Sequence, residues 1–97
     1  MAGSSVTVPV MYVAEIQRRA HIAGQLTMWT IYDHPSDFPN VYVARCHIAT
    51  PPDQAGPTEH TLECTDLQFI RAAMVGAGLT CLMRAQTDDP KIVETWL

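Results

Sequence analysis

The feature that most constrains the fold is a run of alternating side chains that ends in two prolines. Residues 27–32 are mostly β-branched or aromatic, and Trp29 and Ile31 occupy alternate positions within them. Successive side chains of a strand point to opposite faces, so this run predicts a strand with Trp29 and Ile31 on one face. Pro35 and Pro39 follow, and they predict a turn because a proline nitrogen cannot donate a sheet hydrogen bond.

Glycines, prolines and a capping pattern divide the rest of the chain into further elements. Pro9 can occupy the first turn of a helix whose apolar residues recur at helical spacing until Gly24. A second helix is expected after Thr65, since Thr65 and Gln68 have the spacing of a capping box and Gly76 and Gly78 offer the left-handed stop. The strands are expected at residues 27–32, 41–49, 60–64, 79–85 and 92–97.

The order of these elements predicts an α+β fold. Apart from the second helix, no connection is long enough to join parallel strands, so we expect a four- or five-stranded, mostly antiparallel sheet. The capped helix should lie across one face of this sheet, in addition to the N-terminal helix. A chain of 97 residues buries enough surface for one thin core and one domain.

A turn centred on Ala55 predicts the register of the first hairpin. That register pairs Cys46 with Cys64 and His47 with Glu63. The two cysteines would face each other as buried free thiols, because 3 cysteines form an odd set that does not suit a disulfide framework. His47 and Glu63 would lie on the opposite, polar face.

Cysteine and histidine side chains in this hairpin raise the question of a zinc site. Along a single strand, His60 and Cys64 would lie about 13 Å apart, which is too far for one ion. His47 would point away from both. We therefore expect no metal and no cofactor, and we interpret the cysteines as small apolar residues of the core.

The C-terminal hairpin is expected to carry apolar side chains on both faces. A register that pairs Cys81 with Thr95 leaves Leu82, Ile92 and Trp96 together on the second face. One helix cannot cover both faces, so this second face is expected to meet the N-terminal helix, a second subunit or a partner protein. Leu82, Ile92 and Trp96 are therefore candidate interaction residues.

The turn after the first strand carries two carboxylates and an imidazole. Asp33 could orient His34 for proton transfer near neutral pH, with Asp37 nearby in sequence. The surrounding prolines favour a simpler interpretation, in which the Asp side chains accept hydrogen bonds from turn amides. We therefore assign Asp33, His34 and Asp37 to the interaction surface. The alternative is a small enzyme or ligand-binding protein, in which Asp33, His34, His47 and Glu63 would converge on one concavity.

Charge and hydropathy argue against several classes of function. The formal net charge is −4, with 6 Lys and Arg residues, whereas a phosphate-binding surface needs clustered basic side chains. No apolar run approaches the roughly 18 residues of a membrane span, and the basic start of a signal peptide is missing. We expect no nucleic-acid partner, no membrane contact and a cytoplasmic location, with a protein partner or a homodimer instead.

Two segments of the sequence resemble one known group of proteins. The segment WTIYDHPSDFP begins at Trp29, and DDPKIVETW begins at Asp88. They resemble the start and the end of small uncharacterised bacterial and phage proteins, which have W-T-I/V-Y-D-x-P-x-D-F/Y-P and D-D-P-x-I-V-E-x-W. The resemblance lapses before Met28, so it implies a single domain over residues 28–97 and an added N-terminal tail and helix over residues 1–27. It implies no mechanism, because that family has no known activity.

Together, these patterns predict a non-catalytic, phage-related interaction module. It would bind a protein partner or a second copy of itself through a sheet face and through the turn at residues 33–39.

Overall fold

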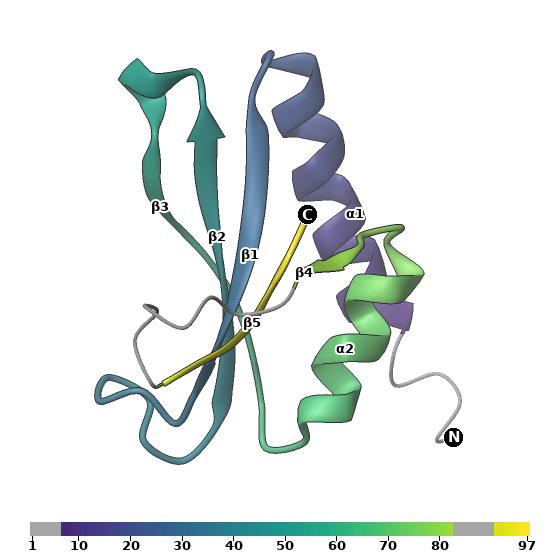
Figure 1. Cartoon of the computed structure of the whole chain (residues 1–97). Coiled ribbons are helices and arrows are strands. Elements are labelled where there is room, and N and C mark those ends of the chain that lie inside the picture. The colour runs from purple at the N-terminus through teal and green to yellow at the C-terminus, as the bar shows by residue number, and fades with distance from the viewer. Residues whose placement is uncertain (1–6, 83–90) are drawn as a thin grey trace.

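The computed structural model describes residues 7–82 and 91–97 and shows a five-stranded sheet with two α-helices (Figure 1). The strand order is β3-β2-β1-β5-β4, and every neighbouring pair is antiparallel. The predicted α+β class and antiparallel sheet are confirmed. In chain order the elements are α1 (Thr7–Ile22), β1 (Leu26–Asp33), β2 (Tyr42–Thr50), the 3-10 turn η2 (Pro52–Gln54), β3 (Gly56–Cys64), α2 (Leu67–Gly76), β4 (Cys81–Leu82) and β5 (Ile92–Trp96).

Both helices lie on the same side of the sheet, to the right of the strands in Figure 1. The core between the two layers contains side chains from α1, α2, β1, β2 and β5, together with Leu79, which precedes β4. Trp29 and Ile31 of β1 are fully buried in it, as the alternating pattern predicts. We call the sheet face that points away from the helices the far face. The buried core cluster is Val13, Trp29, Ile31, Ala44, Cys46, Ile70, Met74, Leu79 and Trp96.

Helix α1 is tied to the sheet through Gln17. Its side-chain oxygen accepts hydrogen bonds from Thr27 Oγ1 at 2.6 Å and from Trp29 Nε1 at 2.9 Å. Val13, on the same side of the helix, is fully buried. After α1, Gly24 adopts φ +73°, a left-handed conformation that ends the helix at the predicted position. The division of the chain into residues 1–27 and 28–97 stays a prediction.

The cap of α2 differs from the predicted one. Asp66 is the N-cap, and its Oδ1 accepts a hydrogen bond from the backbone N–H of Gln68 at 2.9 Å. Asp66 has an extended backbone and directly precedes Leu67, so its short side chain reaches the second free amide of the helix. The predicted capping box at Thr65 is therefore wrong by one residue.

The register of β2 and β3 also differs from the prediction. Cys64 pairs with Tyr42, so Cys46 and Cys64 do not face each other, although all 3 cysteines are free. The strand β3 begins at Gly56 rather than at residue 60. The reason is the compact 3-10 turn η2, which reverses the chain within residues 51–55 and shifts the turn centre towards the N-terminus.

A bulge in β3 accompanies this register. Arg45 pairs with Thr61 and His47 pairs with Pro57, so Cys46 alone lies opposite residues 58–60. Thr58 Oγ1 donates a hydrogen bond to the backbone oxygen of Cys46 at 2.9 Å. Such bulges re-aim side chains, and this one lies on an edge strand of the sheet.

The strands β4 and β5 are one residue out of the predicted register. Cys81 pairs with Trp96, not with Thr95, and Leu82 pairs with Thr95. A slip of one residue moves each side chain to the other face of a sheet. The part of the predicted strand 79–85 that follows Leu82 lies outside the described residues, as does the turn at residues 86–90.

Candidate functional site

The structure separates Trp96 from the other two residues predicted to form an apolar interaction face. Trp96 points into the core and is only 6% exposed, next to its pairing partner Trp29. Ile92 lies on the far face, because the pairing of β1 with β5 shifts by one residue between Glu94 and Ile92. Leu82 lies on the edge strand β4 opposite Thr95, so it shares the far face with Ile92, and it is exposed. The predicted grouping of Leu82, Ile92 and Trp96 on one face is therefore wrong.

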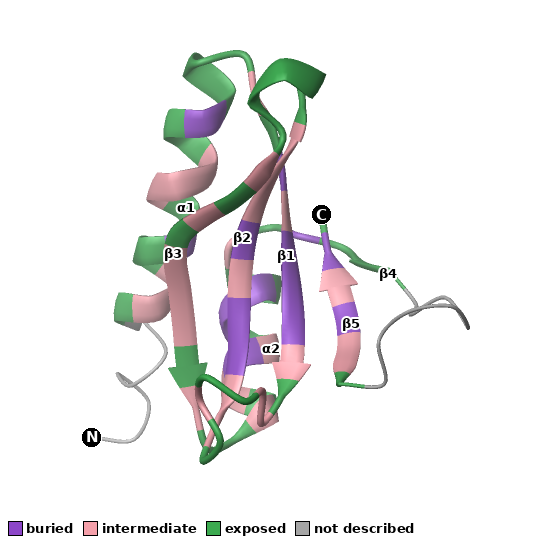
Figure 2. Cartoon of the chain, turned by 90° about the vertical axis from the view of Figure 1, so that its left-hand side faces the viewer, coloured by how far each residue is buried: buried purple, intermediate pink, exposed green. Residues whose placement is uncertain are grey.

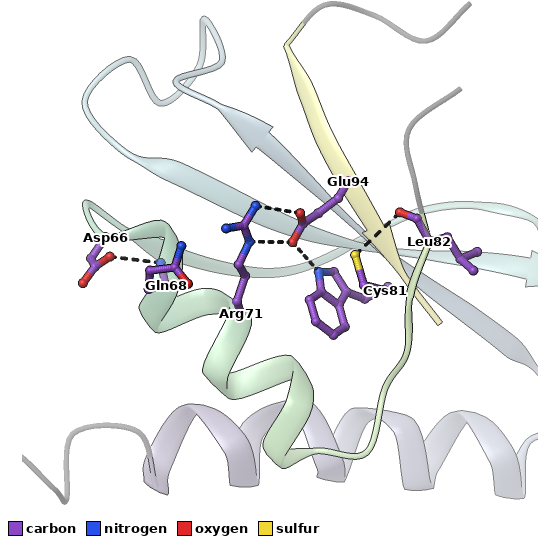
Figure 3. A network of polar contacts seen from close by, with 7 residues as sticks. Asp66, Gln68, Arg71, Cys81, Leu82 and Glu94 are labelled. Carbon is purple, nitrogen blue, oxygen red and sulfur yellow. Dashed lines mark hydrogen bonds and ion pairs between the residues drawn. The ribbon is translucent and has the colours of Figure 1, made fainter. Parts of the chain in front are cut away.

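Trp96 is held in the core by a buried carboxylate. Its Nε1 donates to Glu94 Oε2 at 2.9 Å, and Arg71 of α2 donates two further hydrogen bonds to the same carboxylate (Figure 3). Burial alone would raise the pKa of Glu94, but the hydrogen bonds from Arg71 and Trp96 hold it below its ordinary value. The alternation of Glu94 and Trp96 signals a shared face, whereas no local spacing connects residues 71 and 94.

The acidic turn brings two of its three predicted residues together. His34 Nδ1 lies 2.5 Å from Asp33 Oδ1, and its ring packs edge to face against Tyr42. His34 adopts φ +47°, which is uncommon for a residue with a side chain. Asp37 instead accepts a hydrogen bond from Arg45 Nη2 at 3.0 Å. Asp33, His34 and Asp37 thus form two separate polar contacts.

The four residues of the enzyme alternative do not converge. Glu63 pairs with Val43 on β2 and accepts a hydrogen bond from Thr61, whereas His47 lies four positions further along β2, about 13 Å away. Asp33 is the last residue of β1, where it pairs with Tyr42, and His34 follows it in the turn. Within residues 7–82 and 91–97, no group of three or more His, Cys, Asp or Glu side chains could hold a metal ion.

The far face contains a shallow hollow of about 530 Å³ (Figure 2 views this side, with α2 behind the strands). Its floor consists of side chains from β1, and its edges come from β2, β5 and the start of β3. The apolar members are partly buried rather than fully covered. The residues that line it include Met28, Thr30, Tyr32, His47, Ile92 and Thr95.

His47 is the unusual polar residue of this hollow. Among the described residues, its Nε2 is buried without a hydrogen-bond partner. Burial lowers the pKa of His47, and the nearby charge of Arg45 lowers it further. An unpartnered buried nitrogen typically costs about 1–3 kcal/mol, so its place on the far face is a candidate functional feature.

Comparison with known proteins adds no relative. The chain matches no protein-family model, no curated protein and no solved structure. The fold and the side-chain geometry therefore carry the functional argument. Neither described helix is long and apolar enough to cross a membrane.

Proposed function

We propose that this chain is a non-catalytic interaction module whose far face binds another protein chain, either a second copy or a protein partner. The observation that carries the proposal is that α1 and α2 both cover the same face of the sheet. Neither described helix covers the far face, where apolar side chains of β1 and β5 stay partly exposed.

The composition of the far face suits contact with a protein. Met28, Tyr32 and Ile92 provide apolar and aromatic surface at its centre. Arg45 and Glu63 lie towards its edge, so charges of both signs form a polar rim. Burying one large apolar side chain contributes roughly 1.5–3 kcal/mol to the free energy of association. A second sheet could pack face to face on this surface at a spacing of about 10 Å. A face of this kind gains stability when another chain covers it.

The cellular setting belongs to the same proposal. The resemblance to bacterial and phage proteins supports a phage-related origin, and the composition supports a cytoplasmic protein. The 6 Lys and Arg residues among 97 support a protein partner over a nucleic acid. The turn residues Asp33, His34 and Asp37 border the sheet at one end and would extend the contact surface.

Charged substitutions on and off the far face test the proposal. Ile92→Lys and Thr95→Lys place a charge in the hollow, whereas Val75→Lys is a control on the exposed surface of α2, away from the far face. Sedimentation equilibrium of the full chain measures self-association. We expect wild type and Val75→Lys to form the same dimer and the two far-face variants to be monomeric. Circular dichroism establishes that each variant folds.

A monomeric wild type directs the test to a partner. Cross-linking mass spectrometry in the native host then compares wild type with the same three variants. A partner cross-linked to the far face, lost in Ile92→Lys and Thr95→Lys but kept in Val75→Lys, supports the module. A monomer whose cross-links do not change with these substitutions would refute it.

A further inference from the structure

A second hollow lies on the helix side of the sheet, between the C-terminal half of α1 and strands β1, β2 and β3. Its volume is about 540 Å³, within the range typical of small-molecule sites. We call it the α1 groove. It arises because α1 packs against α2 and β1, so the helix leaves space above the inner face of β2 and β3.

The floor of the α1 groove is apolar. Ile16 and Ala20 contribute from α1, and Cys46 and Ile48 contribute from β2. Burial raises the pKa of the Cys46 thiol, so it stays an uncharged part of this floor at neutral pH. The floor therefore suits an aliphatic chain better than a polar or charged body.

The β3 bulge supplies polar groups at the edge of the groove. Thr58 and His60 both line it, and Thr58 Oγ1 accepts a hydrogen bond from the backbone N–H of His60 at 3.1 Å. The ring of Tyr12 packs edge to face against His60 and also against Trp29. Tyr12 thus bridges the helix and the sheet, and His60 is presented to the groove.

The charged side chains that line the groove are Glu15 and Arg19. Glu15 accepts hydrogen bonds from both Arg18 and Arg19, and these bonds, first those of Arg18, lower the pKa of Glu15 to about 2. Arg18 binds both oxygens of Glu15 and offsets its charge, so the three side chains together carry a net positive charge. Arg19 lines the groove and Arg18 does not. Within the described part of the chain, Arg19 bonds to Glu15 through Nε, which leaves its terminal NH2 groups for a ligand.

We propose that the α1 groove binds a small amphipathic carboxylate, such as a medium-chain fatty acid. The aliphatic chain lies over Ile16 and Ile48, and the carboxylate lies between Arg19 and His60. An apolar floor with a few placed polar groups is the usual form of such a site, and guanidinium groups bind carboxylates in paired hydrogen bonds. The groove is on the opposite side of the sheet from the far face.

A ligand series tests the charge of the head group. Decanoate, decanol and decylamine, each below its critical micelle concentration, are titrated into the full chain labelled with ¹⁵N. We expect decanoate to shift the backbone amide resonances of the residues that line the groove. Decanol should bind about tenfold more weakly, and decylamine should not bind. Absence of decanoate shifts at these amides, or equal binding of decylamine, would overturn the proposal.

Two matched pairs of variants locate the site. Arg18 and Arg19 are both exposed and both bind Glu15, so Arg19→Gln should weaken decanoate binding about tenfold, with Arg18→Gln close to wild type. Ala23→Trp should fill the groove and abolish binding, whereas Ala14→Trp, exposed elsewhere on α1, should not. Equal effects within either pair contradict the assignment. Decanoate binding unchanged in Ile92→Lys would separate this site from the far face.

Discussion

Arg71 of α2 and Glu94 of β5 are joined by two hydrogen bonds, from Nε to Oε2 at 3.0 Å and from Nη2 to Oε1 at 2.9 Å (Figure 3). Only 10% of the Glu94 side chain is exposed, compared with 34% for Arg71. The pair lies 23 positions apart in sequence and connects the second helix to the strand beside β1. The Glu94 carboxylate is therefore the more buried partner. The effect of substituting Arg71 depends mainly on the free-energy cost of leaving this carboxylate buried without its guanidinium partner.

We expect Arg71→Ala to lower the free energy of unfolding by about 2 kcal/mol, because it leaves a buried carboxylate with fewer hydrogen bonds. Arg71→Lys should recover part of this loss, since it keeps the charge but not the paired geometry. Urea denaturation measures both. Arg18→Ala is the control at an exposed ion pair, where solvent screening makes the expected loss much smaller. Equal losses for Arg71→Ala and Arg18→Ala would contradict this assignment.

The low pKa of Glu94 predicts a pH dependence of stability. Its ordinary value is 4.5, and the folded value is lower. The stabilisation is thus complete above the ordinary pKa and is lost as pH falls through the folded one. The difference in unfolding free energy between wild type and Glu94→Gln should be constant near neutral pH and shrink below pH 4.5. A difference that stays constant down to strongly acidic pH would show that Glu94 is not the group that titrates.

Glu15 titrates in an overlapping range, because its pKa is lowered from 4.5 to about 2. It lies on the exposed surface of α1, so salt should screen its interactions much more than those of buried Glu94. The comparison with Glu94→Gln is therefore made at high ionic strength.

The N-cap of α2 allows a direct test of Asp66 against Thr65. Asp66→Ala should cost about 1 kcal/mol, because the Gln68 amide loses its acceptor. Thr65→Ala should be nearly neutral, since Thr65 is exposed and is not the N-cap. Chemical denaturation midpoints measure the two effects. The opposite order of effects would restore the capping box predicted from the sequence.

The position of each helix and strand along the chain was more predictable than the pairing register of the strands. The alternation around Trp29 and Ile31 places β1 correctly, and Gly24 and Gly78 follow the two helices with positive φ. These signals are local, since they arise from backbone sterics and from side chains one or two residues apart. Local chemistry therefore indicates the fold class, which the sheet confirms.

The registers could not be predicted in the same way. Pairing of Cys46 with Cys64 assumes a turn centred on Ala55, but η2 tightens that turn and the β3 bulge absorbs extra residues near Thr58. A register error of one residue between β4 and β5 predicts Trp96 on an exposed face, whereas its side chain lies in the core. Alternative loop conformations and bulge positions differ little in free energy, and tertiary packing selects among them. The hydrophobic pattern alone therefore does not specify them.

The candidate sites depend on those same choices. Nothing in the local sequence indicates that α1 and α2 share one face of the sheet, or that Arg19 and His60 border one groove. Both arrangements depend on how the loops connect the helices and strands in space. The predicted turn residues are adjacent in sequence, yet Asp37 contacts Arg45 rather than His34.

The close approach of the two helices at Gly76 gives the last prediction. A Cβ added to Gly76 would lie 2.6 Å from Val10 Cγ2 and 3.3 Å from its Cγ1. Val10 is β-branched within α1, so its χ1 angle is largely restricted to one rotamer and it cannot easily move aside. The glycine is therefore required by packing between the helices.

Gly76→Ala gains up to about 1 kcal/mol of helix propensity but crowds Val10 at a cost of about 1–3 kcal/mol, so we expect a net loss of stability. Removing the branched side chain should relieve the crowding. The double variant Val10→Ala/Gly76→Ala should then be at least about 1 kcal/mol more stable than the sum of the two single changes predicts. Val8, which is 73% exposed on the same helix, provides the control valine. Val8→Ala should show no such coupling with Gly76→Ala, and equal coupling for the two valines would place the contact elsewhere.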